Sequence, residues 1–148
     1  PAVNVGTSVS RVGGSAQTKA MKKVAGKLKL ALAQFRELEA FSQFGSDLDE
    51  ATRKQLDLGR RLTELMKQPQ YSPVSMEKQV ISLYAVNNGY MDDVAVEDIS
   101  RFETSLHEFM ETQGSEILNA IKVQKELTEE IEGELKTLLK NFKQGWSK

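Results

Sequence analysis

The sequence predicts an all-α protein, a helical bundle of about five to six helices preceded by a short strand and loop tail. Apolar residues recur at spacings of three and four over most of the sequence after residue 18. Glycine, proline and capping residues divide this pattern into segments of helical length, joined by short polar connections. Only the run from Val3 to Val9 alternates apolar and polar residues as a strand does.

The N-terminal tail is expected to be the end of a preceding domain in a larger protein. A glycine- and serine-rich loop follows the strand-like run, with Ser10 and Arg11 at its start. A strand needs a neighbouring strand for its backbone hydrogen bonds, and the sequence shows no second strand. Residues 1–16 are therefore expected to be mobile or paired with another protein molecule. A lone arginine on such a loop suits a phosphate bound elsewhere.

Two helices are expected in the first half of the sequence. The first runs from Lys19 to Phe44 and is ended by Gly45, because glycine is the commonest residue just after a helix. The second runs from Leu48 to Lys67. Asp47 and Glu50 at its start have the spacing of a capping box, in which each side chain binds the other residue's backbone N–H.

Three shorter helices follow. Ser72 is expected to cap a third helix, with Pro73 as its first residue and an Asn-Asn-Gly sequence ending at Gly89 as its stop. A fourth helix is expected from Val96 to Thr112. A fifth runs through Ile117 to Ile121, after a glycine and a serine interrupt the pattern.

The last helix carries the clearest signals. Thr128 is its expected N-cap, Glu129 and Glu130 lie in the first turn, and Lys140 and Lys143 lie near the end, as the helix dipole favours. Its apolar stripe consists of Ile131, Leu135, Leu138, Leu139 and Phe142.

The amino-acid composition excludes several classes of function. The 148 residues suit about one domain, and 39% hydrophobic and 28% charged residues are ordinary for a globular protein. A net charge of −1 argues against a nucleic-acid partner, since such domains are usually basic. The absence of cysteine excludes disulfides and thiolate chemistry. No apolar run approaches the ~20 residues needed to span a bilayer, so no membrane insertion is expected.

No catalytic motif is complete in this sequence. A phosphate loop, a His-Glu-x-x-His pair, a calcium loop and a nucleophile elbow are all missing, and no metal site is expected. The single histidine, His107, is expected at the surface or at a core boundary. Trp146 is expected to pack on the core or to lie in a frayed end, with a partner contact as the other interpretation.

Several segments, in a fixed order along the sequence, resemble one known family, the alpha subunits of F-type ATP synthases. They are Val5-Gly6-Thr7-Ser8-Val9-Ser10-Arg11-Val12-Gly13, Gln17-Thr18-Lys19-Ala20-Met21-Lys22, Phe41-Ser42-Gln43-Phe44-Gly45-Ser46-Asp47-Leu48-Asp49, Arg61-Leu62-Thr63-Glu64-Leu65, Lys67-Gln68-Pro69-Gln70-Tyr71-Ser72-Pro73 and Ile81-Ser82-Leu83-Tyr84-Ala85. The resemblance implies that residues 1–18 are the tail of a nucleotide-binding domain and residues 19–148 the C-terminal helical domain.

The same resemblance implies a place in a catalytic head that makes ATP from ADP and phosphate with a proton gradient. The head lies peripherally on the cytoplasmic face of the bacterial inner membrane. Beta and gamma subunits are the implied partners, and ATP or ADP with magnesium the implied ligands of the whole complex. The fragment alone, which lacks the phosphate loop, is expected to be no enzyme and to hold no cofactor.

The resemblance also implies site residues. Arg11 corresponds to an arginine finger that enters the catalytic site of a neighbouring beta subunit, with Ser10 beside it. Gln68 and Gln70 correspond to residues near the base in the alpha subunit's own non-catalytic nucleotide site, and Pro69 between them departs from the glycine common in the family. The loop implied to face the rotor consists of Phe44, Gly45, Ser46, Asp47, Leu48 and Asp49.

A second reading from another class remains open at this point. The helices also suit a free-standing protein-interaction module with a disordered N-terminal tail. An upstream phosphate loop in the reading frame would distinguish the first reading from the second.

Overall fold

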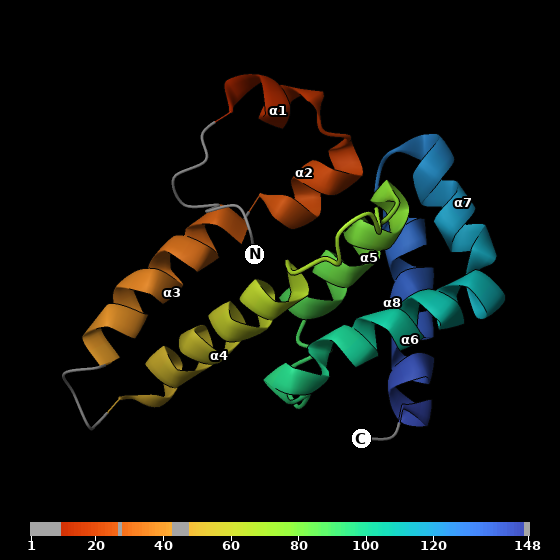
Figure 1. Cartoon of the computed structure of the whole chain (residues 1–148). Coiled ribbons are helices and arrows are strands. Elements are labelled where there is room, and N and C mark those ends of the chain that lie inside the picture. Colours follow the sequence, from red (N-terminus) through yellow and green to blue (C-terminus); the bar gives the residue numbers. More distant parts are fainter. Residues whose placement is uncertain (1–9, 27, 43–47, 147–148) are drawn as a thin grey trace.

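The structure, a computed structural model, describes residues 10–26, 28–42 and 48–146 (Figure 1). Within these ranges it contains eight α-helices, one short 3-10 helix and no strand, which confirms the predicted all-α class. The predicted strand Val3–Val9 lies outside the described residues. The elements are α1 (Arg11–Ala16), α2 (Lys19–Ala25), α3 (Leu28–Ser42), α4 (Glu50–Leu65), α5 (Met76–Asn87), η1 (Val96–Asp98), α6 (Ile99–Gln113), α7 (Ser115–Gln124) and α8 (Glu129–Gly145).

The prediction of one continuous helix from Lys19 to Phe44 is wrong, because the helix divides there into α2 and α3. Thr18 caps the start of α2 by accepting a hydrogen bond from the Met21 amide at 3.2 Å. Gly26 ends α2, and its N–H donates to the Lys22 carbonyl at 3.0 Å. Glycine disfavours a helix interior by about 1 kcal/mol, so a break here is cheap.

Helices α3 and α4 form an antiparallel hairpin that extends away from the other helices (Figure 1). The predicted cap of α4 is corrected to a later aspartate. Asp49 is the N-cap, and its Oδ1 accepts a hydrogen bond from the Thr52 amide at 2.7 Å. The hydrogen bond from Thr52 also lowers the pKa of the Asp49 carboxyl. Asp47, the capping residue expected from the sequence, lies outside the described residues.

Helix α5 begins later than predicted, since its N-cap is Ser75 rather than Ser72. The Ser72 amide instead donates a hydrogen bond to the Pro69 carbonyl at 3.3 Å, so the backbone from Pro69 to Ser72 forms a turn. Seven consecutive residues of α5, from Val80 to Val86, are buried, so the helix is enclosed on every side.

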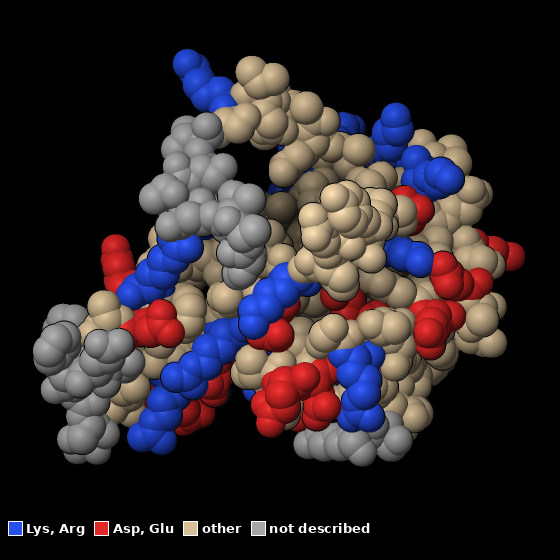
Figure 2. Space-filling model, in the orientation of Figure 1, with Lys and Arg blue, Asp and Glu red and all other residues tan. Residues whose placement is uncertain are grey.

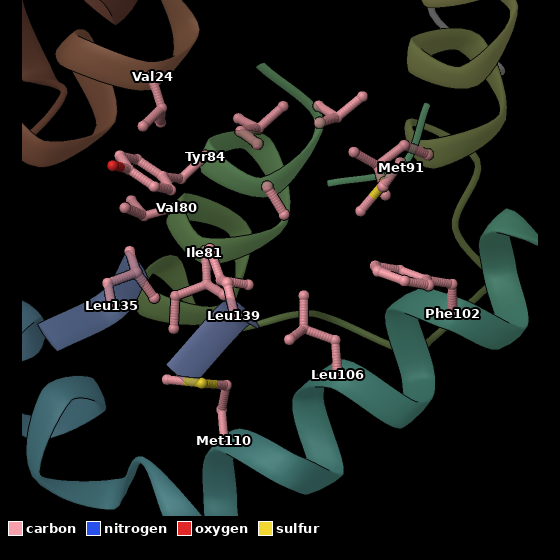
Figure 3. Close-up of a cluster of buried hydrophobic side chains, with 14 of the residues drawn as sticks. Val24, Val80, Ile81, Tyr84, Met91, Phe102, Leu106, Met110, Leu135 and Leu139 are labelled. Atoms are coloured by element: carbon pink, nitrogen blue, oxygen red, sulfur yellow. The ribbon is translucent and has the colours of Figure 1, made fainter. Parts of the chain in front are cut away.

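The core surrounds α5. Side chains from α2, α6 and α8 converge on it, and Figure 3 shows Val24 near Tyr84 on one side and Leu106 and Met110 beneath it. The buried hydrophobic residues of all these helices belong to a single cluster. One contiguous core of this kind is typical of a single domain.

The last helix starts and ends as the sequence indicates. The Ile131 amide donates to the Thr128 hydroxyl at 3.3 Å, which confirms the predicted N-cap. At the other end Trp146 packs edge-on against Phe102 of α6, with ring centroids 5.0 Å apart. The guanidinium of Arg101 lies over the Trp146 ring at 5.1 Å. The core-packing interpretation of Trp146 is therefore confirmed.

The connection between α7 and α8 holds α2 in place. The Ala20 amide donates to the Lys125 carbonyl at 2.9 Å, and Lys23 Nζ donates to the Leu127 carbonyl at 3.1 Å. Lys19 pairs with Glu126 at 3.0 Å, across 107 residues of sequence. Lys125 itself adopts a left-handed conformation, φ 56°, which ends α7 and turns the backbone toward α8.

Basic side chains follow α4 across the face seen in Figure 2. Two basic residues of α4 have acidic partners on the same helix: Lys54 pairs with Glu50 at 2.7 Å and Arg60 with Asp57 at 3.5 Å. Arg61 reaches away from the helix, and its guanidinium donates to the Asp92 carbonyl at 2.6 Å and to the Val94 carbonyl at 3.1 Å. This arginine ties the hairpin to the loop before α6.

Candidate functional site

The connection between α4 and α5 is a compact turn that displays two side chains. Gln68 donates its side-chain amide to the Ser72 carbonyl, and the Ser72 amide bonds to Pro69. Between them Tyr71 adopts a left-handed conformation, φ 59°, and is 92% exposed. A non-glycine residue in this region is uncommon, and it persists where surrounding bonds enforce it. The turn therefore presents Gln70 and Tyr71 outward.

The two glutamines named from the sequence have different settings in this turn. The side-chain amide nitrogen of Gln68 donates a hydrogen bond to the Ser72 carbonyl. Gln70 is exposed, and among the described residues its carboxamide has no hydrogen-bond partner. Gln70 thus has a free donor and a free acceptor, whereas Gln68 mainly shapes the turn.

Arg11 and Ser10 lie at the start of α1, so the prediction of a loop at these positions is wrong. The Ser10 hydroxyl accepts a hydrogen bond from the Gly13 amide at 2.8 Å and caps the helix. The Ser15 hydroxyl donates to the Arg11 carbonyl at 3.1 Å. Sequence reasoning took the two glycines as loop residues and missed that Ser10 satisfies a backbone donor of a short helix.

Helix α1 buries none of its residues, and Arg11 is exposed. Within the described part of the protein the Arg11 guanidinium has no ion-pair or hydrogen-bond partner. Arg11 and the turn that carries Gln70 lie on separate elements. The described residues thus form two separate candidate sites, one for each of these side chains.

The segment predicted to face a rotor is described only at its end. Phe44, Gly45, Ser46 and Asp47 lie outside the described residues. Leu48 is half-buried, and Asp49 serves as the N-cap of α4. At the described end of this segment, Asp49 therefore stabilises the start of α4 at the tip of the α3–α4 hairpin.

A hollow that the sequence did not predict lies beside the turn. It measures about 280 Å³ and is bounded by the end of α4, the turn itself, α5 and α6. Ser82 of α5 and His107 of α6 meet in its wall, with Ser82 Oγ 2.8 Å from His107 Nε2. Glu103, one turn before His107, places Oε1 3.8 Å from the same nitrogen. The only sequence signal was the spacing of four between Glu103 and His107, which puts both on one face of a helix.

Burial shifts the pKa values of both Glu103 and His107. Burial raises the pKa of the Glu103 carboxyl, and a hydrogen bond with Ser82 opposes that rise. Burial also lowers the pKa of the His107 imidazole, and the nearby charge of Lys78 lowers it further. Near neutral pH His107 is therefore uncharged, and Glu103 has no cation beside it. The predicted boundary position of His107 is confirmed, since its side chain is 13% exposed.

Over residues 10–26, 28–42 and 48–146, no group of three or more His, Cys, Asp or Glu side chains is arranged to hold a metal ion. In the same ranges no helix has the length and apolar character that crossing a bilayer demands.

Comparison with known proteins places these features in a family. Residues 17–142 match the family model of the ATP synthase alpha/beta chain, C-terminal domain. The protein is 56% identical over 147 residues to ATP synthase subunit alpha of Desulfovibrio desulfuricans, a match that covers 99% of this sequence and 29% of the relative. It is 58% identical over 143 residues to ATP synthase subunit alpha 2 of Legionella pneumophila strain Corby, with 97% of this sequence and 28% of the relative covered. The protein thus spans less than a third of the length of these relatives.

Proposed function

The protein belongs to the family defined by the C-terminal domain of ATP synthase alpha and beta subunits, and from this premise we propose that it serves as the C-terminal part of an alpha subunit in a proton-driven ATP synthase. The observation that supports this most directly is the identity of 56–58% to alpha subunits over nearly the whole sequence. The helical bundle itself supports only the domain, because a fold alone does not specify an activity.

In this proposal the protein works inside a catalytic head that lies on the cytoplasmic face of a bacterial inner membrane and makes ATP from ADP and phosphate. Beta and gamma subunits are its partners. ATP or ADP and magnesium belong to the whole complex. Residues 1–18 belong to the tail of the nucleotide-binding domain, and residues 19–148 form the C-terminal domain.

Arg11 is proposed as an arginine finger that acts on the catalytic site of a neighbouring beta subunit, with Ser10 holding the start of α1. Its guanidinium is exposed and has no partner in the described part of the protein, so it is free to reach an outside phosphate. Negative charge spreads over the oxygens of a transferring phosphoryl group, and a planar guanidinium stabilises it without losing its own proton. Such arginines contribute roughly 10³ to 10⁵ in rate.

The test is the steady-state ATPase rate of assembled complexes that carry Arg11→Lys or Arg11→Ala. Both variants are expected to assemble and bind nucleotide, while turnover falls by about 10³-fold or more, because an ammonium cannot reproduce the planar fork. Arg53→Lys, which alters another exposed arginine, is the matched control and should turn over normally. Near-normal turnover of the Arg11 variants would remove the finger from the proposal.

Gln68 and Gln70 are proposed to lie beside the base of a nucleotide in the alpha subunit's non-catalytic site. The free carboxamide of Gln70 has a donor and an acceptor suited to a base edge. Gln68 keeps the turn in shape and has its amide oxygen to spare. In the intact complex Gln70→Ala should weaken nucleotide binding at that site, measured by equilibrium binding, while Gln79→Ala, which alters a glutamine beyond the turn, should not.

The loop from Phe44 to Asp49 is proposed to contact the rotating gamma subunit. These 148 residues contain no cysteine, so an introduced thiol is the only one among them. Ser46→Cys is expected to cross-link to gamma in the assembled complex. A cysteine at Thr137, an exposed residue of α8, is the control and should give no cross-link to gamma.

The isolated protein is proposed to be inactive and to bind ATP too weakly to measure. The groups that hold phosphates are usually backbone amides of a phosphate loop, and this sequence has no such loop. Calorimetry with magnesium and ATP tests this, and a micromolar affinity would contradict it.

A further inference from the structure

The hollow beside the α4–α5 turn contains an acid, Glu103, that the proposed function does not use and that has no lysine or arginine partner among the described residues. Glu103 is half-buried, with 20% of its side chain exposed. A carboxylate in such a setting loses part of its hydration and gains no opposite charge in return.

The lysines in and beside the hollow already form ion pairs with other acids. Lys67 lines the hollow, but its Nζ pairs with Glu64, which lies outside the lining. Lys78 pairs with Glu111. His107 Nε2 is hydrogen-bonded to Ser82 Oγ, and the imidazole is uncharged near neutral pH. The uncompensated charge of the wall is therefore negative.

The neighbouring amides add acceptors around this charge. Gln79 donates its side-chain nitrogen to the Val74 carbonyl at 2.7 Å, and Gln68 donates its own to Ser72. Within the described residues both amide oxygens remain without a partner. Both glutamines line the hollow, so a hydrogen-bond donor that enters it meets two spare acceptors as well as the carboxylate.

Part of the remaining lining is apolar and suits a short alkyl stem. It includes Leu65, Met66, Val74 and Leu83. Ligand sites commonly combine an apolar lining with a few polar groups that fix orientation. A ligand with an alkyl stem and a charged donor at one end would cover both parts of the wall.

We propose that this hollow binds a short alkyl group that ends in an ammonium or guanidinium, with Glu103 as the counter-ion and the oxygens of Gln68 and Gln79 as further acceptors. The cation comes either from a lysine or arginine side chain of a partner protein or from a free alkylamine. This site is separate from Arg11 and does not require the nucleotide contacts proposed for Gln70, and it shares Gln68 with the proposed nucleotide site.

The probes that test the proposal are n-butylguanidinium and n-butylurea, which share a shape and differ in charge. Proton–nitrogen NMR spectra of the 148-residue protein should show saturable shifts at the turn and at α6 with n-butylguanidinium. Binding of n-butylurea should be about tenfold weaker or more, because a hydrogen bond to a charged group is the stronger kind. Equal binding of the two probes, or no saturable shift, would overturn the proposal without any mutation.

Two variants assign the counter-ion. Glu103→Gln should weaken n-butylguanidinium binding about tenfold or more, whereas Glu108→Gln, on the same helix and outside the lining, should leave it unchanged. An equal loss in both variants would contradict a specific site. Gln70→Ala should bind the probe normally, which keeps this result independent of the nucleotide proposal.

The source of the cation is settled with two further probes. A short peptide with one central arginine represents a partner side chain, and putrescine represents a free amine. Tighter binding of the peptide assigns the hollow to a protein partner, and tighter binding of putrescine assigns it to a small amine. Failure of both to compete with n-butylguanidinium would overturn the assignment of the ligand class.

Discussion

Gly59 of α4 lies directly against the ring of Phe35 of α3. A Cβ atom added at Gly59 would overlap the Cβ, Cγ and Cδ2 atoms of Phe35. Phe35 is itself buried, with 7% of its surface exposed. The glycine that weakens the middle of α4 as a helix former is thus the residue that lets the two helices of the hairpin approach closely.

Gly59→Ala should destabilise the protein. Overpacking of a close contact costs about 1–3 kcal/mol, and the better helix propensity of alanine recovers at most about 1 kcal/mol. Urea unfolding followed by circular dichroism measures the net loss. The matched control is Gly133→Ala in α8, where a Cβ meets no atom within 4 Å, and which should gain about 0.5–1 kcal/mol. Equal gains in both variants would show that the hairpin tolerates the extra atom.

Thr128→Ala should cost about 1 kcal/mol of unfolding free energy, because it removes the cap that accepts from the Ile131 amide. Thr137 is the comparison on the same helix. Its hydroxyl donates to the Gly133 carbonyl within an exposed stretch, so Thr137→Ala should change stability by less than about 0.5 kcal/mol. Similar losses in the two variants would show that the capping bond is not what matters.

His107 should titrate below its ordinary pKa of 6.5, since burial and the charge of Lys78 both lower the pKa of the imidazole. It is the only histidine, so its ring protons are resolved in an NMR titration. Because the folded pKa is depressed, the neutral ring contributes stability that is fully present above pH 6.5 and is lost as pH falls through the folded pKa.

Lys78→Met should move the pKa of His107 upward, toward 6.5, because a nearby positive charge is removed. Glu111, which pairs with Lys78, faces the same imidazole and acts in the opposite direction. Lys122→Met, which removes a distant surface lysine, should leave the titration unchanged. A pKa of His107 at or above 6.5 in the unmutated protein would contradict its burial.

The single tryptophan, Trp146, reports on the end of α8. Phe102→Leu should shift its fluorescence toward longer wavelength and remove about 0.5–1.5 kcal/mol of edge-on ring contact. Phe109→Leu removes a ring that contacts Phe142 and not Trp146, so it should change stability with little change in emission. Unchanged emission in the Phe102 variant would mean that Trp146 lies elsewhere in solution.

The sequence predicted the start of α8 correctly from local signals alone. Thr128 provides the capping hydroxyl, acidic residues occupy the first turn, and an apolar stripe follows along the helix. The helix begins at this cap. At Ser72 and Pro73 equally good local signals failed, because Gln68 bonds to the Ser72 backbone and holds it in a turn. Local propensity cannot weigh such a bond against a cap.

The hollow was beyond sequence reasoning for a different reason. Ser82 and His107 are 25 residues apart on different helices, and their contact depends on how α5 packs on α6. In the sequence nothing marks Glu103 except its spacing of four from His107. Its burial follows only from the three-dimensional arrangement, whereas Gln68 and Gln70 of the α4–α5 turn were named from the family resemblance, and their role remains a prediction.

The bonds between α2 and residues 125–127 also set an order of events during synthesis. The backbone carbonyls of Lys125 and Leu127, which hold α2, are made about a hundred residues after α2 itself. While the nascent polypeptide is still on the ribosome, Ala20 and Val24 have no completed core to enter. The α3–α4 hairpin joins neighbouring segments and has its partner at once. Within this domain, a helix that is synthesised before most of the others is therefore among the last to dock.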